Sequence, residues 1–183
     1  KKDMSYSNYI NDFSAVPIAP ITEPVTLAEA KLYCRVTTSA EDTLITLMIT
    51  QAREAIEVAT GLSLIPKDIT TYFNNVSGNF DIPFGPVDID TFELFDMEQD
   101  ALEITTPNLQ LIGNEFPKLS SPRYANLKAT YEAGYTTIPK DLKLAILDQI
   151  SYDYENRGLD SDSGICEKSW KACQRWTRIS PIL

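Results

Sequence analysis

The chain has 183 residues, of which 43% are hydrophobic, and it carries a net charge of −10 at pH 7 with no histidine. This length fits one domain, or one domain with extended arms, and the apolar content is enough for a core. The missing histidine removes the commonest general base and the usual transition-metal ligand, so we expect no enzyme, no catalytic or metal site and no cofactor. The acidic balance argues against tight binding of nucleic acid, and no apolar run is long enough to predict a membrane span.

The first 24 residues predict an extended N-terminal arm. Pro17, Pro20 and Pro24 are spaced so that they disfavour a helix and favour extended backbone. Two interpretations stay open, a loose tail or an arm that docks on a neighbouring subunit. Three cysteines without CxxC spacing indicate reduced thiols and a cytosolic origin.

Two helices are predicted next. Thr26 and Glu29 have the spacing of a capping box, so a helix begins after Thr26. A longer helix is expected from Ser39 as N-cap to Gly61 as its end. Its main apolar stripe is Leu44, Leu47, Met48, Ala52, Ala55 and Ala59. Further apolar residues widen that surface, which predicts a helix that is central in a domain or shared with a partner: Ile45, Ile49, Ile56 and Val58.

Residues 66–127 predict a β-rich section of five or six short strands, mostly antiparallel. Asn74-Asn75 and Gly78-Asn79 are typical of turns between such strands. This section carries 3 basic and 10 acidic residues, many of them between Asp88 and Asp100. The acidic run is interpreted as a solvated strand face and loop in preference to a metal cluster, and it lacks EF-hand spacing.

Residues 129–158 predict a short strand, a glycine turn and a helix with both ends marked. Pro139 suits the first helical position, while Asp141 in the first turn and Arg157 in the last complement the helix dipole. Gly158 is expected to end the helix.

The C-terminal segment predicts a polar linker followed by a short amphipathic helix over residues 165–179, or a tail that becomes ordered on a partner. Trp170, Cys173 and Trp176 fall at roughly helical spacing. Because tryptophan and arginine are enriched in interface hot spots, we expect a partner interface here. Its candidate residues are Trp170, Lys171, Arg175, Trp176 and Arg178. The alternative is that both tryptophans cover the chain's own core.

Together these elements predict an α+β fold. Its helical core consists of the two N-terminal helices and a helix near 139–157, with a β-rich antiparallel middle section and extended termini. The expected organisation is an arm at 1–24, a domain at 25–158 with its β-rich insert at about 66–127, and a linker and tail at 159–183.

Residues 24–66 and 128–158 resemble the head–tail connector family of tailed phages, also called head-completion or adaptor proteins. The first part carries the resemblance in residues 25–31, Arg35, Val36, 41–45, Ala52, 55–57, Thr60 and Gly61. The second part carries it in Tyr131, 133–135, Ile138, Pro139, 141–143, Ala145, Ile146 and 154–157. The order and separation of these pieces make the resemblance more specific than either part alone.

The resemblance implies a structural virion protein that forms a homo-oligomeric ring, typically of twelve copies, in the head–tail neck. The ring would dock on the portal protein, contact tail or neck proteins and continue a channel through which DNA passes without specific binding. Assembly would take place in the host cytoplasm, away from any membrane. The acidic composition agrees with a channel along which DNA slides without sticking.

Two other functions stay open from the sequence. One is a cytosolic, non-enzymatic binding domain such as a chaperone or regulator. The other is a hydrolase that uses paired carboxylates between Asp88 and Glu103, which would need two of them on either side of a cleft.

Overall fold

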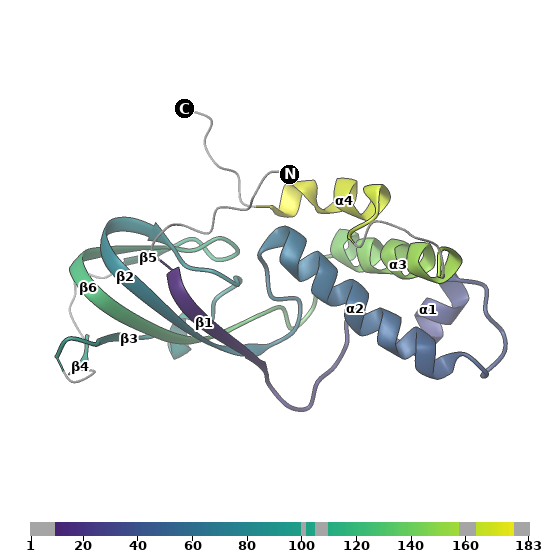
Figure 1. Cartoon of the computed structure of the whole chain (residues 1–183), viewed down its shortest axis with the longest axis horizontal. Helices are drawn as coiled ribbons and strands as arrows, with labels where there is room; N and C mark the ends of the chain where they lie inside the picture. Colours follow the sequence, from purple (N-terminus) through teal and green to yellow (C-terminus); the bar gives the residue numbers. More distant parts are fainter. Residues whose placement is uncertain (1–9, 100–101, 105–109, 158–163, 178–183) are drawn as a thin grey trace. The chain divides into compact units, whose positions relative to one another are not determined.

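The computed structural model describes residues 10–99, 102–104, 110–157 and 164–177, which combine an antiparallel sheet with α-helices (Figure 1). The chain divides into two compact units. The sheet unit comprises Lys1–Ile21 and Ile65–Tyr135, and the helical unit comprises Thr22–Leu64 and Thr136–Leu183. The mixed α+β class is therefore confirmed. The N-terminal residues expected to form an extended arm include a strand of the sheet, Ile10–Pro17.

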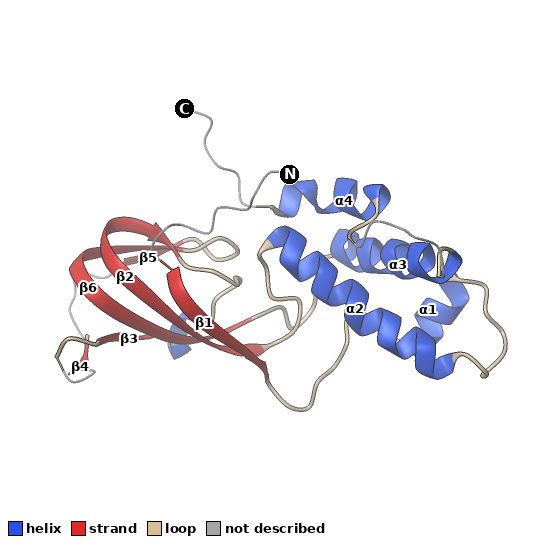
Figure 2. Cartoon of the chain, viewed as in Figure 1, coloured by secondary structure: helices blue, strands red, loops and turns tan. Residues whose placement is uncertain are grey.

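The sheet is built on two long antiparallel strands (Figure 2). Its order is β1-β2-β6-β3-β4, with β5 paired to β6. The strands are β1 (Ile10–Pro17), β2 (Lys67–Asp81), β3 (Glu93–Asp96), β4 (Leu102–Glu103), β5 (Gln110–Ile112) and β6 (Lys118–Ala133). All the pairings are antiparallel.

The prediction of only short strands was wrong, because β2 has 15 residues and β6 has 16. The expected turn residues lie inside β2, where the pairing register shifts between Val76 and Gly78. Asn75 and Gly78 adopt positive φ there, so residues that favour turns are accommodated by an irregularity of the ladder. Pro122 of β6 lies opposite this irregularity, where a missing N–H costs the ladder little.

An apolar cluster forms the core of the sheet unit. Phe73 and Ile82 are fully buried in it, and the Phe73 and Phe80 rings meet edge to face at 5.1 Å. The Tyr131 hydroxyl donates a hydrogen bond of 2.7 Å to the Pro83 carbonyl, which satisfies the one polar atom of that buried side chain.

The helical unit contains α1 (Leu27–Tyr33), α2 (Asp42–Thr60), α3 (Lys140–Glu155) and α4 (Glu167–Cys173). The capping box of Thr26 and Glu29 is present, and Gly61 ends α2 with φ 73°. Two short 3₁₀ segments complete the description, η1 (Ile89–Thr91) in the sheet unit and η2 (Gln174–Trp176) after α4. In the described part of the chain, no helix combines the length and the apolarity that a bilayer crossing requires.

Two details of the predicted helix ends differ from the structure. The residue that caps the N-terminus of α2 is Glu41, because residues 39–41 form a turn before the helix and the Asp42 N–H reaches the Ser39 carbonyl. Pro139 precedes α3 as its N-cap with extended backbone, and α3 ends at the cap Asn156. Gly158, expected as the end of this helix, lies outside the described residues.

The buried face of α2 differs from the predicted stripe. Ile45, Ala52 and Ile56 are fully buried, whereas Leu47 and Val58 are 65% and 64% exposed. The true buried face also contains the polar residues Arg53 and Glu57, which a search for apolar periodicity leaves out. An amphipathic helix is therefore present, but it is rotated from the predicted orientation.

Candidate interface surfaces

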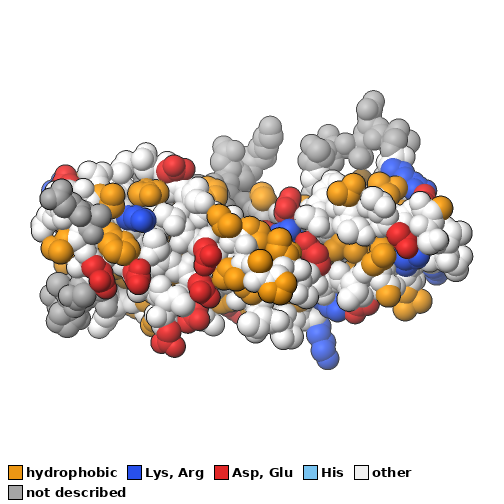
Figure 3. All heavy atoms as spheres, turned by 90° about the horizontal axis from the view of Figure 1, so that it is seen from below, with side chains coloured by type: hydrophobic (Ala, Val, Ile, Leu, Met, Phe, Trp, Pro, Cys, Tyr) orange, Lys and Arg blue, Asp and Glu red, His pale blue; other side chains and the backbone are white. Residues whose placement is uncertain are grey.

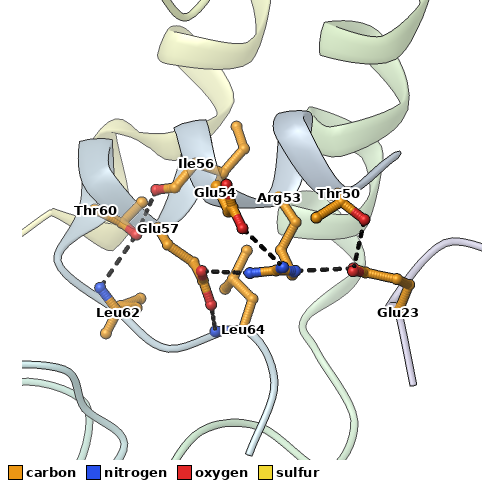
Figure 4. Close-up of polar contacts among 9 residues, drawn as sticks. All are labelled: Glu23, Thr50, Arg53, Glu54, Ile56, Glu57, Thr60, Leu62 and Leu64. Carbon is orange, nitrogen blue, oxygen red and sulfur yellow. Dashed lines mark hydrogen bonds and ion pairs between the residues drawn. The ribbon is translucent and has the colours of Figure 1, made fainter. Parts of the chain in front are cut away.

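A buried ion network on α2 binds two other segments, the one before α1 and the one after α2 (Figure 4). The Arg53 side chain is 5% exposed, and its guanidinium contacts Glu23 at 2.8 Å and Glu57 at 2.7 Å. The other Glu57 oxygen accepts the Leu64 N–H at 2.8 Å, and Thr50 donates to Glu23. One guanidinium thus connects the segment before α1 with the segment after α2.

The Arg53 guanidinium stays protonated in this network. Burial disfavours the charged form of Arg53, but its hydrogen bond to Glu23 and the charges of Glu57, Glu23 and Glu54 outweigh this effect and raise the pKa of the guanidinium. Sequence reasoning missed this network, although Arg53 and Glu57 have the i,i+4 spacing of a helical ion pair.

Exposed pairs connect the other helices of the unit. Lys143 of α3 contacts Glu29 of α1 at 2.7 Å, and Arg157 after α3 contacts Glu41 before α2. The Arg157 guanidinium also lies 4.2 Å above the Tyr154 ring, whose hydroxyl donates to Glu41. The hydrogen bonds from Tyr154 and then Arg157 lower the pKa of Glu41. Arg157, predicted to complement the dipole of its own helix, therefore also pairs with the start of α2.

α4 is held against α3 by one face of its short helix. The Ser169 hydroxyl donates to the Ala145 carbonyl at 2.8 Å, and the Gln149 amide oxygen accepts the Cys166 N–H at 2.7 Å. Cys173 is fully buried on the same side, and burial raises the pKa of its thiol to about 12. This docked face is formed by Cys166, Ser169 and Cys173, whereas Trp170, which shares the helical spacing of Cys173, is 39% exposed.

A buried carboxylate adds a second anchor for α4. Asp148 of α3 is 6% exposed, and it contacts the Lys168 ammonium at 2.5 Å and accepts the Tyr33 hydroxyl of α1. The hydrogen bond with Asp148, followed by that with Tyr33, raises the pKa of Lys168. Three helices therefore meet at one carboxylate, and α4 belongs to the helical unit.

The outer side of α4 and η2 contains most of the predicted partner-interface residues. We define this tail face by Trp170, Lys171, Arg175 and Trp176. Trp170 is 39% exposed, Lys171 and Arg175 are exposed, and Trp176 is partly buried. Arg178, the fifth candidate, lies outside the described residues. The structure brings the four together on one segment, and whether they bind a partner stays a prediction.

The tail face is aromatic and locally balanced in charge. Lys171 pairs with Glu167 one turn earlier, Arg175 pairs with Asp141 of α3, and the Arg175 guanidinium lies 5.3 Å from the Trp176 ring. Among the described residues, no acceptor reaches the buried indole N–H of Trp176. An indole N–H without a partner is unusual, because buried tryptophan normally finds an acceptor.

The sheet unit offers a different kind of surface. β1 forms one edge of the sheet, and Phe13 and Val16 on it are 51% and 56% exposed. A hollow of about 360 Å³ lies beside it, lined by Asn11, Asp12, Tyr72, Phe73, Asn74, Met97, Asn126 and Leu127. Its lining is mixed in polarity and contains a single ionisable carboxylate, Asp12. The hollow therefore lacks the paired acidic groups that hydrolysis would need.

The acidic residues of the sheet unit do not form a compact site in the described ranges. No group of three or more Cys, Asp or Glu side chains is arranged there to hold a metal ion. Asp88 instead caps η1, where its side chain accepts the Asp90 N–H. The chemistry that the described geometry supports is protein–protein contact through exposed apolar and aromatic side chains.

Comparison with known proteins bears on the function. Residues 24–90 match the family of Phage gp6-like head-tail connector proteins. The resemblance to head–tail connectors is thereby confirmed over α1, α2, β2 and the segment that follows β2 up to residue 90. The match ends at residue 90, so the resemblance of residues 128–158 stays a prediction. No curated protein matches the chain significantly.

Three solved structures share the fold. Chains from the neck of an empty GTA particle computed with C6 symmetry and from the virion of a native gene transfer agent (GTA) particle are each 19% identical, with TM-scores of 0.72 and 0.73. A chain from the neck of a native GTA particle computed with C12 symmetry is 14% identical, with a TM-score of 0.57. Each comparison covers 93% of this chain and 97% of the other.

Proposed function

We propose that this chain is a structural, non-enzymatic adaptor of a phage-like neck, which forms a ring, docks on the portal and continues the DNA channel towards the tail. The observation that carries the proposal is the connector family match over residues 24–90, joined to a fold shared over 93% of the chain with neck and virion proteins of GTA particles. The two GTA necks were computed with C6 and C12 symmetry, which supports a ring in which identical copies repeat around an axis.

We further propose twelve copies for the ring and a location in the virion neck after assembly in the host cytoplasm. The acidic balance supports a channel function, because neither unit has a basic excess that would hold DNA phosphates. The sheet unit carries 6 basic and 13 acidic residues and the helical unit 10 and 13. DNA would therefore pass the ring without specific binding.

The tail face is our candidate for contact with the portal or with a tail protein. Support comes from its exposed Trp170 and from the separate set of residues that already docks α4 on α3. Trp170 and Lys171 do not belong to the residues that dock α4 on α3, so a partner can contact these two without displacing α4.

The ring proposal is tested by purifying the chain alone and with its portal ring, and measuring mass by light scattering and shape by negative-stain imaging. We expect discrete rings, or one ring of this chain on each portal. A persistent monomer that leaves the portal bare at equimolar concentration would contradict the proposal.

The tail face is tested by Trp170→Ala and Trp176→Ala, with Tyr152→Ala as a control at an aromatic residue that is 38% exposed on α3. We expect the tryptophan variants to bind the portal at least about tenfold more weakly, because hot-spot aromatics dominate interfaces. Their unfolding midpoints should stay close to that of the wild type. A collapsed thermal transition in the free variants would show that the tryptophans belong to the core.

A further inference from the structure

The outer edge of β1 is an unused row of backbone hydrogen-bonding groups. β1 pairs with β2 over residues Ile10 to Pro17, and among the described residues no strand pairs with its other side. In an antiparallel ladder, roughly half of the N–H and C=O groups of an edge strand point away from its partner. Pro17 has no N–H and the Phe13 N–H already bonds to the Asp12 carboxylate at 2.8 Å, so the eight-residue edge leaves about two donors and about four acceptors available for another extended chain.

This edge carries the features that usually block such pairing only near its two ends: the register with β2 shifts between Ile10 and Asp12, the Asp12 carboxylate accepts the Phe13 N–H, and Pro17 is the last residue. Edge strands are commonly short, carry lysine or an internal proline, or point charges outward. The opposite edge of this sheet follows that rule, since β4 has two residues. β1 has one charged residue, Asp12, and its only proline, Pro17, is its last residue.

Exposed apolar side chains accompany the free edge. Phe13 and Val16 lie on β1, and Ile21 shortly after it is 59% exposed. On the sheet unit in Figure 3, exposed hydrophobic side chains lie among acidic ones. The Phe13 ring also lies 4.9 Å from the Phe84 ring at a tilt of 51°, and Phe84 packs against the core, so part of this apolar surface is held in place. An occupant of the edge would cover apolar side chains as well as backbone groups.

We propose that β1 accepts an extended segment from a second copy of this chain, which adds a strand to the sheet across the subunit boundary. Only extended polypeptide presents alternating donors and acceptors at the spacing of a strand edge. The inference rests on the proposed ring, in which every copy meets an identical neighbour. Ring closure occupies each such edge once, so no open edge is left for unlimited association.

The geometry of a ring restricts the donor segment. Pairing of β1 with β1 of another copy would be a two-fold contact and would stop at a dimer. A ring needs a contact between two different surfaces of the chain. The donor is therefore a different extended segment of the neighbouring copy, and β4, with two residues, is too short to fill the edge.

Two adjacent proline variants, Ser14→Pro and Ala15→Pro, test the proposal at the level of single N–H groups. Consecutive N–H groups of a strand point to opposite sides, and the Ile18 N–H points towards the β2 side, where it bonds to the Pro66 carbonyl. Ser14→Pro is therefore the inward variant, which loses an N–H bonded to β2, and Ala15→Pro is the outward variant, which loses an outward N–H. We expect the outward variant to keep the unfolding midpoint of the free chain and to weaken self-assembly at least about tenfold. The inward variant serves as the control for a destabilised sheet.

Hydrogen–deuterium exchange of the unmodified chain gives a second test that needs no variant. Peptides covering residues 10–17 should exchange more slowly in the ring than in the free chain, while exposed residues of α2 around Gln51 should not follow them. If rings form and residues 10–17 exchange as fast as in the free chain, the β1 proposal fails and the ring proposal stands. Protection of β1 by the portal alone would overturn the choice of a second copy. A chain that never assembles, alone or on the portal, overturns both.

Discussion

The two units of this chain are held together by different physical means. In the helical unit, side-chain contacts connect separate elements, as Arg53 connects the segments around α1 and α2, and Asp148 connects α1, α3 and α4. In the sheet unit, the long ladder between β2 and β6 and an apolar cluster carry the structure. The helical unit should therefore be sensitive to loss of single charged groups, and the sheet unit to changes of backbone geometry.

The largest effect is expected from Arg53→Met in the helical unit. The substitution removes the buried guanidinium that Glu23 and Glu57 contact, and breaking such a network costs about 3–5 kcal/mol. Urea unfolding should measure the loss of unfolding free energy, and hydrogen exchange should show faster exchange of the α2 amides in the variant. Arg157→Met is the matched control, because the Arg157 side chain is 44% exposed and solvent screening makes its pair with Glu41 a much smaller contribution to stability. Equal costs would contradict the role given to burial.

A somewhat smaller effect is expected from Gly134→Ala in the sheet unit. Gly134 has φ 133°, and a Cβ there would lie 2.1 Å from the Ile65 carbonyl oxygen. Backbone strain and this clash should cost about 3 kcal/mol in urea unfolding. Gly78→Ala separates the two causes, since Gly78 has φ 70° but a Cβ added to it would meet no atom within 4 Å. That control should cost about 1 kcal/mol, and a similar loss in both variants would refute the close approach.

The sequence predicted those parts of the fold that depend on neighbouring residues. Thr26 and Glu29 form the expected capping box, and Gly61 ends α2 in the left-handed conformation that glycine permits. These features need only a few adjacent residues, so their outcome depends little on the rest of the chain.

The parts that failed depend on distant residues. Asn75 and Gly78 have the composition of turns, but pairing with β6 keeps them inside β2. The docked face of α4 was missed because it is defined by hydrogen bonds to another helix. Ser169 bonds to Ala145 of α3, and Cys166 bonds to Gln149 of α3. Tertiary contacts of this kind override local propensity and leave no signal in a short window.

The interface residues were predicted from residue type, and the structure tests only their exposure. Trp170, Lys171 and Arg175 are exposed as an interface requires, while Trp176 is partly buried. Exposure is necessary for binding but does not select a partner, so the role of the tail face stays a prediction. The edge of β1 was missed because the prolines near it predicted an extended arm outside the domain, and only the strand order reveals which strand lies at an edge.

The smallest effect concerns pH and the link between α1 and α3. The hydrogen bond from Lys143, followed by that from the Thr26 N–H, lowers the pKa of Glu29 from 4.5 to about 2. A carboxylate with a lowered pKa in the folded state stabilises the fold above its unfolded pKa, and this contribution is lost as the pH falls. The loss should therefore occur between pH 4.5 and about 2.

Glu29→Gln removes the charge and keeps a residue that completes the capping box, so it isolates this contribution. Because the Glu29 side chain is 42% exposed, solvent screening limits the difference in unfolding free energy to less than about 1 kcal/mol near neutral pH. The difference between wild type and variant should shrink in urea unfolding as the pH falls from about 6 to about 2.5. If the difference stays constant over this range, the ionised form of the Glu29 carboxylate is not the source of its contribution to the stability of the helical unit.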